Sequence, residues 1–498
     1  MDKKFHNYNL ELWGGIECTI NRIGDEYLDQ LKYSNHYLRA GDLEKVASLG
    51  IKTLRYPVLW EYHEPIEGGD IDWSFTTRQF ETMNSFGIKP IAGLLHHGSG
   101  PLFTNLLDDL FPEKLARYAG LVAKRFPWIE AYTPVNEPLT TSRFSGLYGF
   151  WYPHKQNDIC FSKMLLNQLK GIVCSMKAIR EINPAARLVQ TEDLGKTYCT
   201  PPLLYQANFE NERRWLTTDL LCGKVDSSHS MWGYFTRLGI STKTLDFFLD
   251  NPCPPDIIGF NHYITSERFL DEDLFKYPSY THGGNELHKY ADVEAVRISS
   301  VKRVGLKNLL SEAWHRYQLP LAITEAQLNC TREEQLRWLA EIWNTSNELL
   351  SEGVDFRAVT AWSLFGAYGW NSLLTTKKME YEPGAFDLRT PTPRPTALTS
   401  LIRSYTLGTD YDHPILKQKG WWHRDTRFRS SSLKPLTSRL SPNNLRPIVI
   451  IGKNGTLGKE FAFNCSTRAL DYILLGRDEV NITNPLEVEN NPGPVLNS

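Results

Sequence analysis

The stretch AYTPVNEP, residues 131–138, decides how the rest of the chain is interpreted. An apolar run leads into the dipeptide Asn136-Glu137 and stops at Pro138. We interpret it as a β-strand that presents a carboxylate beside an amide at its end. There the carboxylate can transfer a proton while the amide orients a sugar hydroxyl. Taken alone, a glutamate at the end of a strand is more often simply solvated.

A second stretch of the same kind, LPLAITEAQ, covers residues 319–327. It is another apolar strand, and it ends in the carboxylate of Glu325. Two strands that each deliver a glutamate to one end of a sheet make the carboxylate pair that hydrolysis of a glycosidic bond requires. The pair is therefore stronger evidence for chemistry than either stretch alone.

Short apolar stretches alternate with helical patterns along most of the chain. Strands are predicted over 11–18, 51–60, 89–97, 131–138, 186–194, 254–263, 319–327 and 356–365. Helices are predicted over 41–50, 73–87, 113–126, 163–182, 211–221, 304–317, 331–350 and 394–405. Eight strand–helix units are what a (β/α)₈ TIM barrel needs, although alternation alone also fits a doubly wound sheet.

Polar residues at the ends of the strands favour the barrel. They are His96, His97, Asn136, Glu137, Glu192, Asp193, Asn261, His262, Tyr263, Glu325 and Trp362. In a barrel they would all converge on the end that carries the active sites of such enzymes, whereas a doubly wound sheet would spread them along a crevice.

The two glutamates have distinct expected roles. Glu137 would be the acid/base and Glu325 the nucleophile, with the carboxyl groups roughly 5–5.5 Å apart if configuration is retained. Tyr263 could donate a hydrogen bond that keeps Glu325 ionised, or could be a packed tyrosine at the end of the sheet. Arg55, buried in mid-strand, needs a carboxylate partner, which is Glu325 or Glu137, with or without a catalytic role.

Two adjacent histidines are open to more than one interpretation. His96 could bind a sugar hydroxyl or could be a core histidine satisfied by the backbone. His97 beside it suggests a metal, but no third ligand has suitable spacing, so no metal is expected.

Composition limits the classes of partner. The chain has 498 residues, 41% hydrophobic and 22% charged, and a net charge of −2, so neither a nucleic-acid nor a membrane partner is expected. The eight cysteines are scattered without a Cys-x-x-Cys pair, and neither a signal peptide nor a membrane span is evident. We therefore expect a cytoplasmic protein with free thiols.

A different composition follows the predicted barrel, which we assign to residues 8–406. Residues 407–445 form a predicted linker, docked in part through Trp421 and Trp422. Residues 446–498 then show a strand, the glycines Gly452, Gly455 and Gly458, a helix and another strand. That order suits a dinucleotide-binding turn. A single β-α-β unit is only part of a Rossmann fold, so NAD(P) is expected to bind only if the fold were complete.

The barrel resembles glycoside hydrolase family 1, the β-glucosidase-like family. The matching stretches are ELWGGIECTINR, LRYPVLWEYHEP, LLHHGSGP, TPVNEP, PPDIIGFNHY, ITEAQ and AWSLFGAYGW, in family order. The resemblance implies that Glu137 is the acid/base and Glu325 the nucleophile. It implies that the sugar is bound by Asn21, Arg55, His96, Asn136, Asn261, Tyr263, Trp362 and Trp370. For the barrel it implies no cofactor.

Several positions depart from the family pattern. Asn21 replaces a glutamine, His97 a tryptophan and Ala326-Gln327 an Asn-Gly pair, while Gly369 replaces the glutamate that binds the far hydroxyls of the sugar. Both catalytic glutamates are kept. These changes favour a divergent glycosidase over a plain β-glucosidase.

The segment 446–498 resembles the N-terminus of the dTDP-4-dehydrorhamnose reductase type of short-chain dehydrogenase. The Tyr-x-x-x-Lys pair of such reductases is not in this sequence, so we expect a truncated fusion. The resemblance suggests work on surface polysaccharide or rhamnose-containing glycans.

Three hypotheses follow. The first is a retaining glycosidase that hydrolyses a small-molecule or oligosaccharide β-glycoside. The second is a non-catalytic carbohydrate-binding barrel accessory to a reductase module. The third is an NAD(P)-dependent sugar-nucleotide reductase, against which the incomplete fold argues. The oligomeric state does not follow from the sequence.

Overall fold

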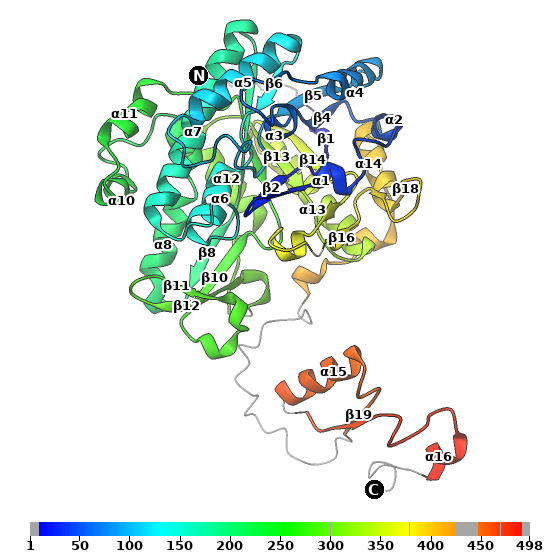
Figure 1. The fold of residues 1–498 in the computed structure, drawn as a ribbon. Coiled ribbons are helices and arrows are strands. Elements are labelled where there is room, and N and C mark those ends of the chain that lie inside the picture. The colour runs from blue at the N-terminus through cyan, green and yellow to red at the C-terminus, as the bar shows by residue number, and fades with distance from the viewer. Residues whose placement is uncertain (1–8, 299, 378, 425–446, 469, 491–498) are drawn as a thin grey trace. The chain divides into compact units, whose positions relative to one another are not determined.

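A computed structural model describes residues 9–298, 300–377, 379–424, 447–468 and 470–490 (Figure 1). The chain forms two compact units. The first comprises the described residues of 1–270, 294–296 and 302–427. The second comprises those of 271–293, 297–301 and 428–498.

Eight strands of the first unit close into a barrel in the order β1-β14-β13-β9-β7-β6-β5-β4. They are β1 (Glu11–Gly15), β4 (Thr53–Pro57), β5 (Lys89–Gly93), β6 (Ala131–Thr133), β7 (Arg187–Asp193), β9 (Ile257–Asn261), β13 (Leu321–Ala326) and β14 (Phe356–Ala361). All neighbours are parallel. This confirms the predicted (β/α)₈ barrel and excludes the doubly wound alternative, whose sheet stays open.

The strands are mostly shorter than the sequence predicted, because the polar residues at their ends leave the ladder. β6 ends at Thr133, and beyond it Asn136 forms only an isolated bridge with His96. The chain then turns through Glu137 into a short helix that begins at Pro138. The strand ends are therefore free to present side chains rather than to pair.

The barrel interior is packed with side chains. A cluster separate from the main core is formed by Trp13, Ile91, Ala131, Val189, Ile257, Ala322 and Ala358, one from each of seven barrel strands. Such a layer is expected inside a barrel of this size. Gly259 on β9 is needed for the close approach, because a Cβ there would lie 2.5 Å from Thr324 Cγ2.

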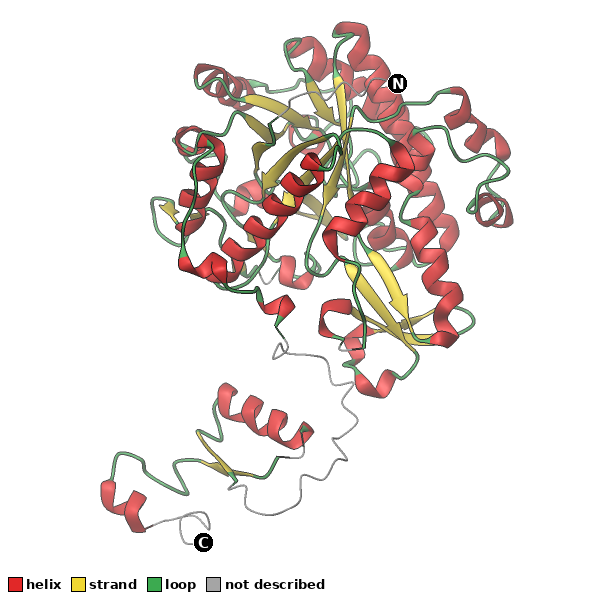
Figure 2. Cartoon of the chain, turned by 180° about the vertical axis from the view of Figure 1, so that it is seen from behind, coloured by secondary structure: helices red, strands yellow, loops and turns green. Residues whose placement is uncertain are grey.

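Helices surround the strands in the first unit (Figure 2). The outer helices are α2 (Asp42–Ser48), α4 (Ser74–Ser85), α5 (Phe111–Arg125), α7 (Asp158–Ile182), α9 (Leu216–Leu221), α12 (Gly305–Tyr317), α13 (Arg332–Ser351) and α14 (Ala397–Leu407). α5 shows why they form: its buried residues Phe111, Leu115, Tyr118 and Val122 recur at helical spacing, while its polar face is exposed. The connecting loops contain α1 (Gln30–Tyr33), α3 (Trp60–His63), α6 (Pro138–Ser142), α8 (Leu204–Arg213), α10 (Trp232–Arg237) and α11 (Thr242–Asp250).

Small strand pairs also lie in these loops. They are β2 (Ile20–Ile23) with β3 (Glu26–Asp29), β8 (Lys196–Cys199) with β10 (Glu267–Asp271), β15 (Ala367–Tyr368) with β16 (Tyr381–Glu382), and β17 (Phe386–Asp387) with β18 (Arg394–Pro395).

The first part of the predicted linker packs on the barrel. Trp422 is 2% exposed, and its ring contacts Trp338 of α13 edge-on with centroids 5.2 Å apart. Its indole N–H donates to Glu341 Oε2 at 2.9 Å. Residues 425–445 of the predicted linker lie outside the described residues.

The second unit contains β11 (His282–Gly284), paired antiparallel with β12 (Lys289–Glu294), and the elements β19 (Ile448–Ile451), α15 (Thr456–Thr467), β20 (Tyr472–Leu475) and α16 (Pro485–Asn490). β19 and β20 pair in parallel, in the β-α-β order predicted from the sequence. Gly452 has a φ of 105°, and a Cβ on Gly458 would lie 2.1 Å from the Gly452 carbonyl oxygen. The turn therefore requires glycine at both positions.

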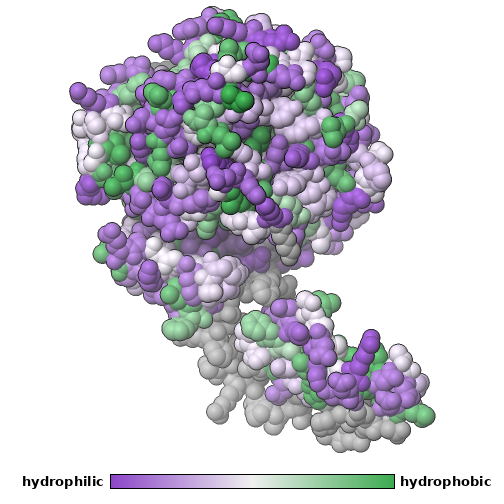
Figure 3. Space-filling model, in the orientation of Figure 1, coloured by the Kyte–Doolittle hydropathy of each residue, from purple (hydrophilic) through white to green (hydrophobic). Residues whose placement is uncertain are grey.

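Polar and apolar side chains are interspersed on the face of the molecule shown in Figure 3, where hydrophilic ones predominate. Among the described helices, none combines the length and the hydrophobicity needed to cross a membrane. None of the eight cysteines forms a disulfide.

Candidate active site

Glu137 is held in an unusual backbone conformation at the end of β6. Its φ of 45° and ψ of 61° are left-handed, which for a residue other than glycine costs about 1–3 kcal/mol. Neighbouring strands hold it there: the Asn136 amide donates to the Leu95 carbonyl at 2.9 Å, and the Glu137 amide donates to the Thr191 carbonyl at 3.2 Å. Strained residues of this kind concentrate at functional sites.

Glu325 lies near the end of β13, and donors hold both of its carboxylate oxygens. Arg55 Nη1 donates to Glu325 Oε1 at 2.9 Å, and the Tyr263 hydroxyl donates to Glu325 Oε2. The side chain of Glu325 is 3% exposed and that of Arg55 6%. Of the two partners proposed for Arg55, the structure therefore selects Glu325.

Glu137 has weaker, neutral partners. Asn261 Nδ2 donates to Glu137 Oε1 at 2.6 Å, and His97 Nε2 lies 3.8 Å from Glu137 Oε2. Asn261 is fixed in turn by the Thr324 hydroxyl, which donates to its Oδ1 at 2.7 Å. The acid/base candidate is thus oriented by an amide, whereas the nucleophile candidate is bound to a cation.

Asn136 joins the groups around the two glutamates. Its Oδ1 accepts from Arg55 Nη2 at 2.8 Å and from the Thr191 hydroxyl at 2.7 Å. Its Nδ2 lies 3.3 Å from His96 Nε2 and 3.2 Å from His97 Nε2. Because an amide nitrogen only donates, both Nε2 atoms must accept, so both imidazoles are neutral.

The pKa values of the histidines agree with neutral rings. Burial, with the nearby His97 and Arg55, holds the pKa of His96 well below its usual value. Burial and Arg55 lower the pKa of His97 to about 3. Among the described residues, no group of three His, Cys, Asp or Glu side chains could hold a metal ion.

The two glutamates differ in acidity. Burial and the negative charges of Glu325, Glu192 and Asp193 raise the pKa of Glu137 well above its usual value. Burial raises the pKa of Glu325 only to about 7, because Arg55 and the Tyr263 hydrogen bond oppose the shift. At neutral pH Glu137 therefore holds a proton more firmly than Glu325, which is the division that an acid and a nucleophile need.

Glu192, another strand-end carboxylate, has a structural task. It accepts from the backbone amides of Leu139 at 2.8 Å and Thr140 at 3.2 Å, and from the Thr217 hydroxyl at 2.7 Å. These amides open helix α6, which begins directly after Glu137. Glu192 thus positions the backbone that carries Glu137.

The predicted tryptophans lie around this cluster. The Trp362 ring stacks on His96 with centroids 5.5 Å apart, and the Arg55 guanidinium carbon lies 4.8 Å from the centre of the same ring. The Trp370 ring contacts the His97 ring edge-on, with their centroids 5.5 Å apart, and His97 links it to the cluster.

The remaining predicted residues do not contact the glutamates. Asn21, on β2, donates to the Leu374 carbonyl at 3.3 Å. Gly452, Gly455 and Gly458 belong to the second unit. The structure thus joins Arg55, His96, Asn136, Asn261, Tyr263, Trp362 and Trp370 to the two glutamates, directly or through one neighbour.

Sequence reasoning missed one acidic residue, Glu17. It follows β1 and is 4% exposed. Burial raises the pKa of its carboxyl above the usual value, opposed by Thr19 and the nearby indoles of Trp362 and Trp370, and its charge raises the pKa of Glu325. The signal in the sequence was the one that identified Glu137, a glutamate at the end of an apolar strand.

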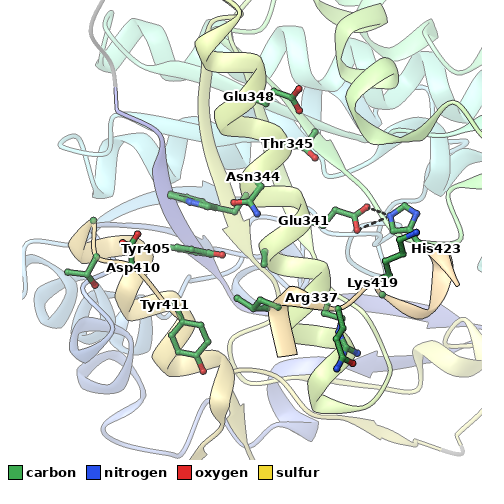
Figure 4. Close-up of a pocket in the computed structure, with 17 residues that line it drawn as sticks. Arg337, Glu341, Asn344, Thr345, Glu348, Tyr405, Asp410, Tyr411, Lys419 and His423 are labelled. Carbon is green, nitrogen blue, oxygen red and sulfur yellow. Dashed lines mark hydrogen bonds and ion pairs between the residues drawn. The ribbon is translucent and has the colours of Figure 1, made fainter. Parts of the chain in front are cut away.

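A cavity of about 690 Å³ lies away from this cluster, between helix α13 and the segment that follows α14 (Figure 4). Its lining includes Arg337, Glu341, Tyr405, Asp410 and His423. Glu341 is already occupied by His423, with Nε2 3.0 Å from both carboxylate oxygens. None of the residues of the glutamate cluster lines it.

Comparison with known proteins adds the family. The model of "Glycosyl hydrolase family 1" matches residues 31–378. A phospho-cellobiase of Klebsiella oxytoca is 21% identical over 373 residues, which cover 69% of this chain and 79% of that protein. A 6-phospho-β-glucosidase of Dickeya chrysanthemi is 22% identical over 378 residues, covering 70% and 79%.

Solved structures show the same fold. The β-glucosidase from Thermotoga maritima in complex with noeuromycin superposes with a TM-score of 0.62 at 16% identity, covering 76% of this chain and 88% of that one. The same enzyme in complex with an octyl calystegine derivative gives 0.65 at 16% identity, covering 81% and 98%. The family match ends at residue 378, so the reductase-type resemblance of 446–498 stays a prediction.

Proposed function

This chain belongs to glycosyl hydrolase family 1 and is a glycoside hydrolase, and we propose that Glu137 and Glu325 are its catalytic pair. Glu325 is the nucleophile and Glu137 the acid/base in the retaining hydrolysis of a β-glycoside. The observation that carries this assignment is the contrast between their partners. Arg55 and Tyr263 stabilise the carboxylate form of Glu325, whereas Glu137 has a neutral amide and acidic neighbours.

The proposed reaction proceeds in two steps. Glu325 attacks the anomeric carbon as the bond to the leaving oxygen breaks, and Glu137 gives its proton to that oxygen. Water then attacks the anomeric carbon, Glu137 accepts a proton from that water, and the bond between the carbon and Glu325 breaks. Each step passes through an oxocarbenium-like transition state, and the barrel needs no cofactor for either.

The surrounding side chains support this chemistry by position. Arg55 holds the nucleophile and Asn136 together, so a sugar bound beside Asn136 meets Glu325 in one fixed geometry. Asn136, His96, Trp362 and Trp370 are proposed to bind the sugar itself, with Asn261 orienting the acid. Asn21 is proposed to affect sugar binding indirectly, by holding the loop at Leu374 through its hydrogen bond to the Leu374 carbonyl.

Covalent trapping tests the proposal directly. A panel of 2-fluoro-β-glycosides is expected to inactivate the enzyme in a time-dependent way. Peptide mass spectrometry should then place one sugar on Glu325. No adduct with any member of the panel, together with tight binding of glycans, would favour the alternative of a non-catalytic binding barrel. An adduct on another residue would reject the assignment of Glu325.

The pH profile gives a second prediction. Because the pKa of Glu325 is about 7 and that of Glu137 is higher, kcat/KM should fall below about pH 7 as the nucleophile gains a proton. On the alkaline side it should fall as Glu137 loses its proton. Tyr263→Phe removes a hydrogen bond that lowers the pKa of Glu325, so its acidic limb should move to higher pH.

The matched control for this profile is Tyr132→Phe. Tyr132 is also a buried barrel tyrosine, but its hydroxyl has no hydrogen-bond partner in the described part of the chain. Its acidic limb should stay in place. An unmoved limb in Tyr263→Phe would remove Tyr263 from the proposed role.

For residues 446–498 we propose the start of a reductase-type Rossmann unit, separate from the barrel of 8–406. The parallel β19-α15-β20 order and the glycines Gly452 and Gly458 support it. With one β-α-β unit, a fluorescence titration with NADPH should show no binding to this chain, and saturable binding would contradict that expectation. A cytoplasmic location is proposed from the absence of disulfides among the eight cysteines.

A further inference from the structure

The cavity of about 690 Å³ beside helix α13 has no task in the proposed mechanism. One of its walls is a face of that helix, because Arg337, Glu341, Asn344 and Glu348 recur at intervals of three or four residues. The opposite wall is the chain over residues 408–423, which follows α14 (Figure 4). A cavity of this volume falls within the range of small-molecule pockets, and it has room for a mono- or disaccharide.

Hydrogen bonds from buried side chains hold the two walls together. Arg337, whose side chain is 6% exposed, donates to Glu334 Oε1 at 2.8 Å and to the Ile415 carbonyl at 3.0 Å. The indole nitrogen of Trp422, which is 2% exposed, donates to Glu341 Oε2 at 2.9 Å. The cavity is therefore kept open by fixed contacts, and a ligand would enter it without first having to order its walls.

The charges around the cavity exclude a strongly ionic ligand. Most of its ionic side chains already have partners, in the pairs Arg337 with Glu334, Glu341 with His423, and Glu348 with Lys307. Asp410 and Lys419 also line it, and they carry opposite charges. Within the described part of the chain, the cavity thus has no cluster of unpaired cations for a phosphate, and a neutral ligand fits it best.

Aromatic rings and unpaired polar groups line the same cavity. Trp343, Tyr405 and Tyr411 are among its residues, and the rings of the first two stack with centroids 4.6 Å apart and planes 8° apart. The Tyr405 hydroxyl and the side chains of Asn344 and Thr345 have no hydrogen-bond partner among the described residues. Flat rings beside free hydroxyl and amide groups match a sugar ring, which has an apolar C–H face and a rim of hydroxyls.

Figure 4 shows that these groups surround the cavity. Asn344 lies between Tyr405 on one side and His423 on the other. Asp410 lies on the side of Tyr405, and Lys419 lies on the side of His423. A ligand there would meet hydrogen-bonding groups from opposite directions, which suits a molecule with hydroxyls around its whole rim.

We propose that this cavity is a second carbohydrate site, which binds a neutral sugar ring on the outer wall of the barrel without cleaving it. The aromatic residues pack against the ring, and Asn344, Thr345 and Asp410 bind its hydroxyls. None of the residues around the two glutamates lines the cavity, so the inference does not depend on the proposed catalytic pair. A free monosaccharide and a unit of a longer glycan present the same ring, and the test separates the two.

Hydrogen–deuterium exchange of the full chain locates the site. The chain carries Glu325→Gln, so that a glycan at the barrel mouth is not cleaved. The probes are cellotetraose, laminaritetraose, maltotetraose, glucose and glucose 6-phosphate. At least one neutral probe is expected to slow exchange at residues 337–348 and 405–423. No change there with any neutral probe, or slower exchange elsewhere only, would overturn the proposal.

Asn344→Ala and Asn347→Ala are the matched variants. Both asparagines are exposed on α13, but Asn347 does not line the cavity, and its amide donates to the Trp343 carbonyl at 3.0 Å. In an exchange titration with the most protective neutral probe, Asn344→Ala should raise Kd about 3- to 10-fold, the range for one lost neutral hydrogen bond. Asn347→Ala should leave Kd unchanged. An unchanged Kd in Asn344→Ala, or an equal rise in both variants, would reject the site.

Comparisons among the probes define the ligand. Protection by glucose as well as a tetrasaccharide supports a site for a single sugar ring, and protection by a tetrasaccharide alone supports a site for a glycan chain. Glucose 6-phosphate should bind no more tightly than glucose, and tighter binding that depends on Asn344 would overturn the assignment of a neutral ligand. Cleavage of a probe by Glu325→Gln would contradict the proposed nucleophile, whereas the contrast between Asn344→Ala and Asn347→Ala would still decide the role of the cavity.

Discussion

Replacing Glu325 by alanine is expected to lower kcat for an aryl β-glycoside by on the order of 10⁴-fold or more, because the covalent step has no other carboxylate at that position. Sodium azide should restore part of the turnover by entering the space that the side chain leaves. The azide would attack the face opposite the leaving group and yield an α-glycosyl azide. Release of p-nitrophenol and NMR of the product measure both effects.

Two further variants serve as a comparison and a control for Glu325→Ala. Glu325→Gln keeps the volume and one acceptor oxygen, which can serve Arg55 or Tyr263, so it should be as inactive without azide and gain less from azide. Glu382→Gln, another buried carboxyl, should keep its activity. Thermal unfolding must accompany the kinetics, because loss of Glu325 leaves the Arg55 charge buried without its carboxylate. Wild-type activity in folded Glu325→Gln would reject the mechanism.

Glu137→Gln is expected to produce a loss that depends on the leaving group. Alkyl and disaccharide substrates need a proton on the departing oxygen, so their kcat/KM should fall about 10²- to 10⁴-fold. A 2,4-dinitrophenyl glycoside leaves without a proton, and its first step should stay fast. The second step then becomes slow, so a burst of dinitrophenol and an accumulated adduct on Glu325 should appear.

The pH profile identifies the same residue by a second route. The alkaline limb assigned to Glu137 should disappear in Glu137→Gln when the first step is followed. The amide keeps an oxygen for Asn261, which donates to Glu137 Oε1 at 2.6 Å in the wild type, so the local structure should survive. An equal loss for good and poor leaving groups would show that Glu137 has a structural role instead.

Much of the fold follows from local pattern. All eight barrel strands lie within the apolar stretches chosen from the sequence, because a strand buried on both faces must be apolar along its length. The ends of the strands were less predictable. Residues 134–138 look like a continuation of β6, but the chain leaves the sheet there so that Glu137 can turn toward Asn261.

The catalytic candidates were predictable for the same local reason, whereas their partners were not. Glu137 and Glu325 each end an apolar run. Which of them binds Arg55 depends on the closure of the barrel, because β4 and β13 are distant in sequence and the contact spans 270 residues. Glu17 was missed because its ring partners come from residues 362 and 370, more than 300 positions away.

The left-handed backbone at Glu137 means that stability and activity make opposite demands on one position. Glycine adopts this conformation without strain, so Glu137→Gly would relax the backbone while removing the proposed acid. Selection for thermal stability alone would therefore favour glycine at position 137. The most stable variant would then lack the proposed acid. The proposed acid/base role of Glu137 would account for this cost in stability.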